Sequence, residues 1–343
     1  MRVYRSTLWL LALLATSCAA MPWSSPAPSS AASAGKLTVA AGGPQSAVAI
    51  TAPFAITTGP DGAVWFGEFS TNRIGRISLT GETRTFLLSD GGLIERMVTG
   101  PDDAIWFTDP TSNRIGRVDT SGSTVYVKLR VPRCGPASIT LGPDGNLWFT
   151  EHVTNRIGRV TPHGTLTEFQ VPGDAGLAGI AAGADGRLYF AENRGNQIGR
   201  ITPDGYIDEF PLPHPGSEPN SVVRGPDNSI WFTELRSARL GRLSPDGQMT
   251  EFVLEVAAPP IGLASGPDGR LWVTFPAAHA ISRVATDGNS HTFRFPASVT
   301  PMLIVAGADG SMWFSEPSGK IGRLTILGAL TEYNVGANDL PIG

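Results

Sequence analysis

The chain has 343 residues, of which 41% are hydrophobic and 16% are charged, and its formal net charge is −4. This apolar content is enough for a large core, and no dense run of Lys and Arg indicates a nucleic-acid surface. With only two cysteines, one of them in the N-terminal segment, a disulfide framework is excluded. The 41 Gly and 28 Pro recur at regular spacing, which is typical of many tight turns rather than of disorder.

Residues 1–20 have the features of an export signal. A positively charged start precedes an apolar run at 8–15 that is too short to span a bilayer. Small residues and Cys18 follow, as in a bacterial lipobox. We therefore expect an exported lipoprotein of the cell envelope, lipid-anchored at Cys18 on the periplasmic or extracellular side. Cleavage near Ala19 or Ala20 without a lipid, or an uncleaved anchor, are the alternatives.

An aromatic pair recurs along the chain at nearly even spacing. Steps of 41 or 42 residues separate the seven copies, Trp65-Phe66, Trp106-Phe107, Trp148-Phe149, Tyr189-Phe190, Trp231-Phe232, Trp272-Val273 and Trp313-Phe314. Each copy contains an apolar segment, a Gly-Pro-Asp-Gly-type turn, the aromatic strand, an Ile-Gly-Arg-type strand, a second glycine turn and a fourth strand. This pattern predicts an all-β fold, a seven-bladed β-propeller with four antiparallel strands per blade. A solenoid is the alternative.

We expect the propeller to occupy residues 36–343, preceded by a tether at 21–35 that is rich in Ser, Ala and Pro. Ring closure can use a C-terminal strand at 330–335, an early strand at 36–41, or both. The expected protein is a monomer that touches the membrane only through its lipid anchor and does not bind nucleic acid.

Two columns of charged residues repeat with the blades. The acidic column follows the aromatic pair and consists of Glu68, Asp109, Glu151, Glu192, Glu234 and Glu316, with Phe275 as the exception. The arginine column consists of Arg76, Arg117, Arg159, Arg200, Arg242, Arg283 and Arg323, and we expect it to accompany the acidic column on the face with the longer loops. A carboxylate needed in nearly every blade favours a structural role over a metal-binding or catalytic ring.

Residues that deviate from the repeat on this loop face are better site candidates, since binding residues gather on longer loops. We expect a small-molecule or protein ligand to bind there. The deviating candidates are Arg96, His152, His214, Glu218, Asn220, Phe275 and His279, and the candidate face also includes Phe54, Glu151, Glu234 and Glu316. No Ser/His/Asp arrangement, Cys/His metal motif or phosphate-binding glycine loop occurs, so no catalytic residue and no metal ligand is assigned.

Several segments resemble streptogramin B lyase (virginiamycin B lyase). They are Leu-Trp-Phe-Thr-Glu at 147–151, Asn-Arg-Ile-Gly-Arg at 155–159 and Leu-Thr-Glu-Phe at 166–169, and the resemblance extends over about residues 50–335. It implies a propeller enzyme that opens cyclic depsipeptide antibiotics by elimination with Mg²⁺. In that family a histidine acts as general acid or base, and a carboxylate helps to hold the metal-bound substrate.

The resemblance places the family's two key histidines, which follow Pro at the start of the sixth and seventh blades, at Ile261 and Met302. The family's nearby glutamate matches Thr300, and its last catalytic glutamate matches Pro317, with Glu316 one residue away. Neither Ile nor Met can transfer a proton. We therefore expect the scaffold without the lyase's catalytic set, and Mg²⁺ only if lyase-like activity is retained.

Three functions remain open at this point. The first is an exported module that binds a ligand or protein without catalysis, and the second is an envelope scaffold subunit. The third is an enzyme of C–O lyase or lactonase type that acts on cyclic depsipeptides or lactones through a relocated site, formed by His152, His214 and the acidic column. Metal-dependent turnover would favour the enzyme, whereas co-purification of one partner without turnover would favour the other two.

Overall fold

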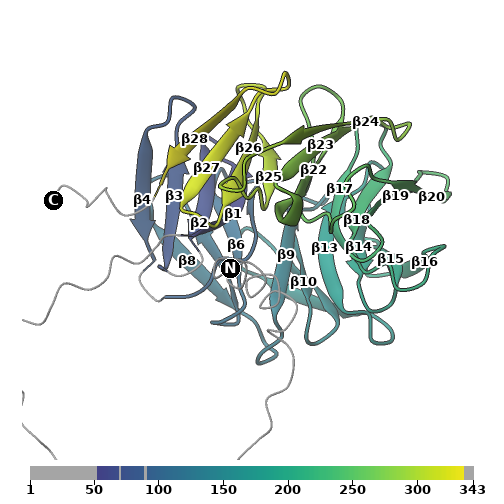
Figure 1. The fold of residues 1–343 in the computed structure, drawn as a ribbon. Helices are drawn as coiled ribbons and strands as arrows, with labels where there is room; N and C mark the ends of the chain where they lie inside the picture. The colour runs from purple at the N-terminus through teal and green to yellow at the C-terminus, as the bar shows by residue number, and fades with distance from the viewer. Residues whose placement is uncertain (1–51, 69–70, 89–90, 336–343) are drawn as a thin grey trace, which may run out of the picture. The chain divides into compact units, whose positions relative to one another are not determined.

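The structure, a computed structural model, describes residues 52–68, 71–88 and 91–335. These residues form seven four-stranded antiparallel sheets arranged as a ring (Figure 1). The predicted seven-bladed β-propeller is therefore confirmed. The export signal at 1–20 with Cys18, the tether at 21–35 and the early strand at 36–41 lie outside the described residues and stay predictions.

The first four blades are built from strands in chain order. They are β1 (Pro53–Thr58), β2 (Val64–Glu68), β3 (Arg73–Ile77), β4 (Thr83–Leu87), β5 (Met97–Thr99), β6 (Ile105–Asp109), β7 (Arg114–Val118), β8 (Thr124–Lys128), β9 (Pro136–Leu141), β10 (Leu147–Glu151), β11 (Arg156–Val160), β12 (Leu166–Gln170), β13 (Leu177–Ala182), β14 (Leu188–Glu192), β15 (Gln197–Ile201) and β16 (Ile207–Pro211).

The last three blades follow the same order. They contain β17 (Pro219–Arg224), β18 (Ile230–Glu234), β19 (Arg239–Leu243), β20 (Met249–Val253), β21 (Leu263–Ser265), β22 (Leu271–Phe275), β23 (Ala280–Val284), β24 (Ser290–Arg294), β25 (Ile304–Ala306), β26 (Met312–Glu316), β27 (Lys320–Leu324) and β28 (Leu330–Asn334). One short 3₁₀ turn, η1 (Pro276–Ala278), is the only helical element among the described residues. None of the helical segments that the structure describes is long and apolar enough to cross a membrane.

The ring closes by packing of whole blades. Within the described ranges every sheet is made of four consecutive strands, and β28 is the fourth strand of blade seven itself. The innermost strand of blade one, β1, contacts β25 and β26 of blade seven (Figure 1). The Ser315 hydroxyl donates a hydrogen bond of 2.7 Å to the Phe54 carbonyl and fastens blade seven to blade one. The equivalent hydroxyl of Thr150 fastens blade three to Ala178 of blade four.

The second strand of each blade is buried along its whole length because neighbouring blades cover both of its sides. Trp106 of β6 and Phe149 of β10 belong to one core cluster that joins blades two and three. The Phe149 ring lies directly on Gly158, where an added Cβ would stand 2.1 Å from the ring. In blade six, Val273 replaces the phenylalanine and Ser282 replaces the glycine opposite it. The glycine of the Ile-Gly-Arg motif is therefore required by the aromatic ring.

Candidate functional site

The arginine column lies at the face with the tight turns, so its expected place beside the acidic column is wrong. On strand three the motif arginine pairs with the tryptophan, as in Trp148 with Arg159, three residues away from the loop-face end. In six blades it lies within 4.0 Å of the aspartate of the first turn, in the pairs Arg76–Asp61, Arg117–Asp102, Arg159–Asp144, Arg242–Asp227, Arg283–Asp268 and Arg323–Asp309. The same aspartate accepts a hydrogen bond from the tryptophan, with 2.9 Å from Trp148 Nε1 to Asp144 Oδ1. Each of these aspartates thus joins an arginine and a tryptophan in a triad at the turn face, and we assign the triads a structural role.

The acidic column lies at the loop-face end of the second strands, where the blades bury it. Glu151, Glu234 and Glu316 are fully buried. Thr154 donates to Glu151 (2.6 Å) and the Thr300 amide donates to Glu316 (3.1 Å), so the carboxylates hold neighbouring loops. Burial raises the pKa of Glu316 to about 7, which the Thr300 amide opposes and the nearby Glu332 carboxylate reinforces. These three glutamates are therefore not exposed binding groups.

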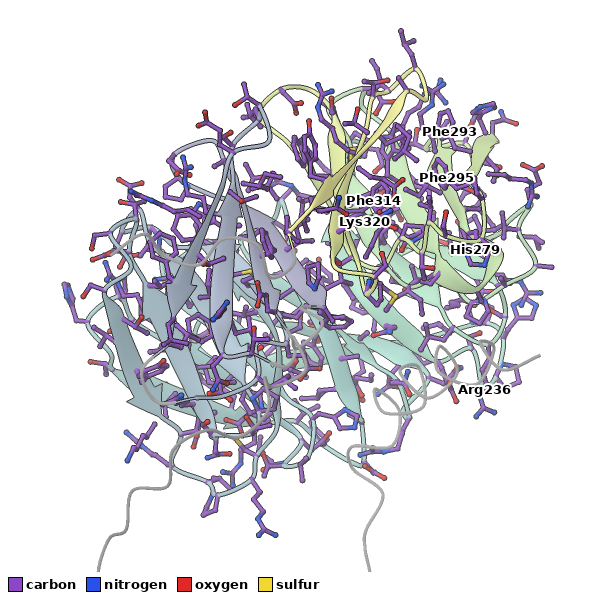
Figure 2. All side chains as sticks on the ribbon, turned by 60° about the vertical axis from the view of Figure 1, so that its left-hand side comes forward. Arg236, His279, Phe293, Phe295, Phe314 and Lys320 are labelled. Carbon is purple, nitrogen blue, oxygen red and sulfur yellow. The ribbon has the colours of Figure 1, made fainter. Side chains whose placement is uncertain are left out.

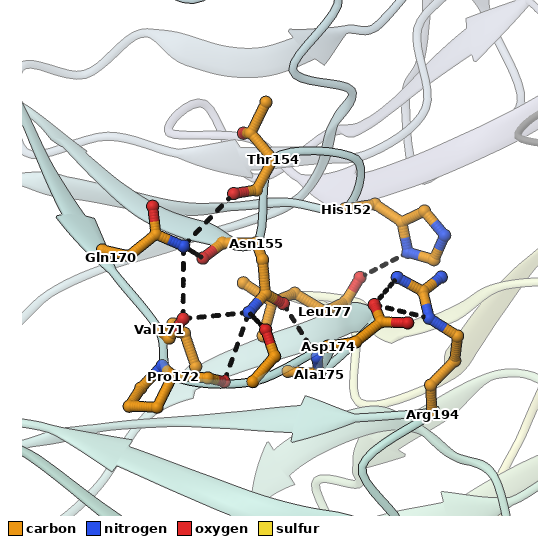
Figure 3. A network of polar contacts seen from close by, with 11 residues as sticks. His152, Thr154, Asn155, Gln170, Val171, Pro172, Asp174, Ala175, Leu177 and Arg194 are labelled. Atoms are coloured by element: carbon orange, nitrogen blue, oxygen red, sulfur yellow. Dashed lines mark hydrogen bonds and ion pairs between the residues drawn. The ribbon is translucent and has the colours of Figure 1, made fainter.

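The three histidine candidates lie in different blades and contact different partners. His152 follows β10, and its Nδ1 lies 2.9 Å from the Leu177 carbonyl of blade four, beside Asp174 and Arg194 (Figure 3). His214 lies between β16 and β17, and its half-exposed ring binds the Glu251 carboxylate. Within the described ranges, no group of three or more His, Cys, Asp or Glu is placed to hold a metal.

His279 of blade six takes the place of a structural asparagine. It has a left-handed backbone (φ 50°), like Asn113 (φ 54°) and Asn155 (φ 58°) at the same position of other blades. Asn155 fixes the link into the next blade through its amide, which donates to Gly173 O and accepts from Ala175 N. His279 does the same through Nδ1, which lies 2.9 Å from the Val299 carbonyl. Figure 2 labels this histidine on the ribbon of blade six.

Two further candidates are occupied by partners or by packing. Glu218 lies 2.5 Å from the guanidinium of Arg236, an exposed side chain at the edge of the molecule in Figure 2. Phe275 is fully buried in the core cluster between blades five and six. It replaces the acidic residue with an apolar one and presents no surface to a ligand.

The first strands of neighbouring blades contact one another and so surround the central axis, where propellers have a channel. A ring of equivalent residues lies at the loop-face end of these first strands, and we call it the channel-mouth ring. Each member lies two residues before the first-strand residue that pairs with the phenylalanine or valine of the second strand. They are Phe54, Glu95, Ala137, Ala178, Asn220, Ile261 and Met302. Phe54 and Met302 are each 2% exposed, and Ile261 packs against the same apolar cluster. The side of the ring formed by blades six, seven and one is thus apolar.

The two polar members of this ring are Glu95 of blade two and Asn220 of blade five, and Arg96 directly follows Glu95. The Arg96 guanidinium lies 5.3 Å from the centre of the Phe54 ring, which is a cation–π distance. Burial raises the pKa of Glu95 and lowers the pKa of Arg96, and the opposite charge of the neighbouring residue counteracts each shift. Asn220, on β17, is half-buried.

A sequence profile described as the Virginiamycin B lyase family matches residues 29–176 and 172–341. The chain belongs to the virginiamycin B lyase family. Virginiamycin B lyase from Staphylococcus aureus is 33% identical, with a TM-score of 0.75 over 80% of this chain and 94% of that one. A streptogramin B lyase structure is 31% identical, with a TM-score of 0.77 over 82% of this chain and 94% of that one. Among curated proteins, no match was found.

The residues present do not fit the metal-dependent chemistry that family membership implies. A third structure, 34% identical with a TM-score of 0.76 over 80% of this chain and 94% of that one, is a catalytically inactive histidine-to-alanine variant of the S. aureus lyase with quinupristin. The positions matched to the family's histidines, Ile261 and Met302, have apolar side chains in one cluster. Glu316, next to the matched Pro317, is buried and holds the Thr300 amide. No Mg²⁺ ligand set is apparent among the residues that the structure describes.

Sequence reasoning missed two residues. Glu95 stands in the channel-mouth ring, but the three-residue strand β5 hid its equivalence to Phe54. Gln197 stands at the start of β15, where most blades have a basic residue. An alignment of the seven repeats on their second and third strands would have found both.

Proposed function

We propose that this chain is an exported, non-catalytic member of the virginiamycin B lyase family that binds a ligand at the loop-face mouth of its channel. The observation that carries the proposal is the apolar cluster of Phe54, Ile261 and Met302. Ile261 and Met302 fill the positions where the family resemblance expects proton-transferring histidines. A positioned general acid or base contributes about 10²–10⁴-fold to a rate, so loss of both removes most of the lyase's acceleration.

The channel-mouth ring and the adjacent Arg96 nevertheless keep groups that can bind. Arg96 and Glu95 supply opposite charges, and Asn220 supplies an amide that can donate and accept hydrogen bonds. Next to the partly buried Ile261, this combination suits a ligand with both apolar and polar groups. A relative in the same family is known as a complex with quinupristin, which makes that molecule the first ligand to test.

The test separates binding from turnover. The full-length chain is incubated with quinupristin and Mg²⁺, and the products are analysed by mass spectrometry beside the S. aureus lyase. We expect no linear product above the level of buffer alone. Titration calorimetry of the same mixture should show binding that Arg96→Ala weakens. Chelator-sensitive linearisation would overturn the proposal.

One arrangement favours the alternative, an enzyme with a relocated site. His214 and Glu251 form a pair close to the buried Glu234, whose pKa is raised by burial and, to a lesser degree, by the Glu251 charge. A histidine oriented by a carboxylate can act as a general base. If linearisation were observed and His214→Ala abolished it, the relocated lyase would replace the binding module as the proposed function.

A further inference from the structure

The acidic column has a basic companion in most blades. The companion is the first residue of strand three, and in five blades it is Arg73, Arg114, Arg156, Arg239 or Lys320. In blade two its contact is direct, with 2.8 Å from Arg114 Nε to Asp109 Oδ2. In blade six both members are replaced together, since Phe275 is paired with Ala280. Acid and base are therefore kept or lost as a unit in these six blades.

Blade four is the exception because it keeps the acid without the base. Glu192 pairs in register with Gln197, which is neutral. The Gln197 amide donates a hydrogen bond of 2.8 Å to Glu192 Oε2. Glu192 is only 1% exposed, and its other oxygen, Oε1, has no hydrogen-bond partner among the described residues. The same oxygen also lacks a donor in Glu68, Glu151, Glu234 and Glu316, so blade four differs in the charge beside the acid and not in this atom. A buried carboxylate oxygen without a donor is costly.

A second carboxylate lies close to the first. Glu209 on β16 is the strand partner of Gly199, and an added Cβ on Gly199 would stand 2.6 Å from Glu192 Oε1. Glu192 and Glu209 thus flank the same glycine. Blade three has the equivalent pair, but there Arg156 lies 3.8 Å from Glu168 and supplies positive charge.

A cavity of about 240 Å³ lies beside Gln197. Its lining includes Glu192, Glu209, Gln197 and Asp174. Figure 3 shows three of its lining residues, Pro172, Asp174 and Ala175, with Asp174 held by Arg194. The charged groups around the cavity are therefore three carboxylates and one guanidinium that is already paired, and the His152 imidazole lies beside Asp174. The electrostatic character of the cavity is anionic, and the unpartnered Glu192 oxygen lines it.

We propose that this blade-four cavity binds a small organic cation, whose guanidinium or primary ammonium head takes the place of the missing strand-three arginine or lysine. Such a head brings N–H donors to the Glu192 oxygen that lacks one, and a guanidinium can bridge two carboxylates with its planar fork. A divalent metal fits less well, because Gln197 turns its amide nitrogen, not its oxygen, toward Glu192. The proposal is independent of the channel-mouth function.

The test uses methylguanidinium and methylammonium chloride as probes. Each is titrated calorimetrically into the full-length chain at pH 8, with ionic strength fixed by potassium chloride. We expect saturable binding of at least one of them, weakened about tenfold or more by Glu192→Gln. Gln197→Arg should also abolish it, because an internal guanidinium then occupies the cavity. Glu151→Gln, at the same position of blade three, is the matched control and should leave the affinity unchanged.

Proton linkage gives a second readout. Burial raises the pKa of Glu192 to about 7, opposed by the Gln197 hydrogen bond and reinforced by Glu209. Lowering the pH from 8 to 6 should therefore weaken binding up to about tenfold, since most Glu192 side chains must then lose a proton first. This dependence should disappear in Glu192→Gln.

Three outcomes would overturn the proposal. They are unchanged binding in Glu192→Gln, saturable binding of Mg²⁺ or Ca²⁺ but not of the organic cations, and no saturable heat with either probe. Circular dichroism and thermal unfolding of each variant establish that it is folded. If either Glu192→Gln or Gln197→Arg does not fold, the other variant still tests the proposal.

Discussion

The two faces of the propeller differ in how uniformly their acidic side chains are held from blade to blade. On the turn face, six blades place an aspartate between a tryptophan and an arginine in the same way. On the loop face, the hydroxyl three residues later holds the buried acid in blades one, three and five (Thr71, Thr154 and Ser237), but Gln197 holds it in blade four and the Thr300 amide in blade seven. Uniform contacts serve the fold, and the loop face, where blades depart from one another, is where function should be sought.

The largest expected effect concerns the core on which both faces depend. Gly158→Ser should destabilise the protein by about 1–3 kcal/mol or more, because its Cβ would overlap the Phe149 ring. Adding Phe149→Val should recover part of this loss, since Val273 and Ser282 already form such a pair in blade six. Urea unfolding of both single variants and the double variant gives the coupling energy, expected at about 1–3 kcal/mol. Additive effects would show that the ring does not constrain the glycine.

A smaller effect separates structural from exposed aspartates on the turn face. Asp144→Ala removes the acceptor of the buried Trp148 indole and should cost about 1–3 kcal/mol. Asp287, an exposed aspartate in a turn between strands three and four, is the control and should matter much less. If substitution of Asp144 and of Asp287 lowered the unfolding free energy equally, the contacts of Asp144 with Trp148 and Arg159 would have no special role in stability.

The same aspartate should also make stability depend on acid. Burial acts to raise the pKa of Asp144, but hydrogen bonds from Asn146 and Trp148 outweigh it and lower the pKa. A group with a lowered folded pKa contributes stability above its unfolded pKa and loses it as the pH falls. The difference in unfolding free energy between wild type and Asp144→Asn should therefore shrink below about pH 4.

The loop face should respond to pH with the opposite sign. The pKa of Glu316 is raised to about 7, so its contribution is fully present below the ordinary carboxyl pKa and is lost as the pH rises through about 7. Relative to Glu316→Gln, the wild-type unfolding temperature should fall between pH 5 and pH 8. Asp309→Asn on the turn face is the control and should show no such trend in this interval. A flat difference for Glu316 would mean that its carboxylate is solvated.

The sequence predicts the fold almost completely because the repeat carries it. Seven aromatic pairs at even spacing determine the blade number, and the turn motifs determine the strand order. Strand register was harder, and without it Arg159 was assigned to the wrong face, although it pairs with Trp148.

The candidate site could be predicted only in part. A deviation from the repeat marks a residue but does not say whether it is buried. Phe275 deviates and lies in the core, and His279 deviates and replaces an asparagine. The cavity in blade four is lined by Gln197, a neutral residue that no sequence motif marks as part of a site. Gln197 becomes a candidate only when the strand pairing shows that it stands opposite Glu192, where most blades have a basic residue.

The smallest expected effect tests whether His279 belongs to the fold or to a site. Its backbone is left-handed, a conformation that asparagine tolerates better than most residues. His279→Asn should therefore change stability by less than about 0.5 kcal/mol. His279→Ala, which lacks any partner for the Val299 carbonyl, should cost about 1 kcal/mol. If His279→Asn left stability unchanged and yet removed quinupristin binding, the imidazole would belong to the binding face, and replacement of a repeat residue would again indicate function. If His279→Asn altered neither stability nor quinupristin binding, His279 would have the same structural role in blade six that Asn155 has in blade three. The departure from the repeat at this position would then be purely structural.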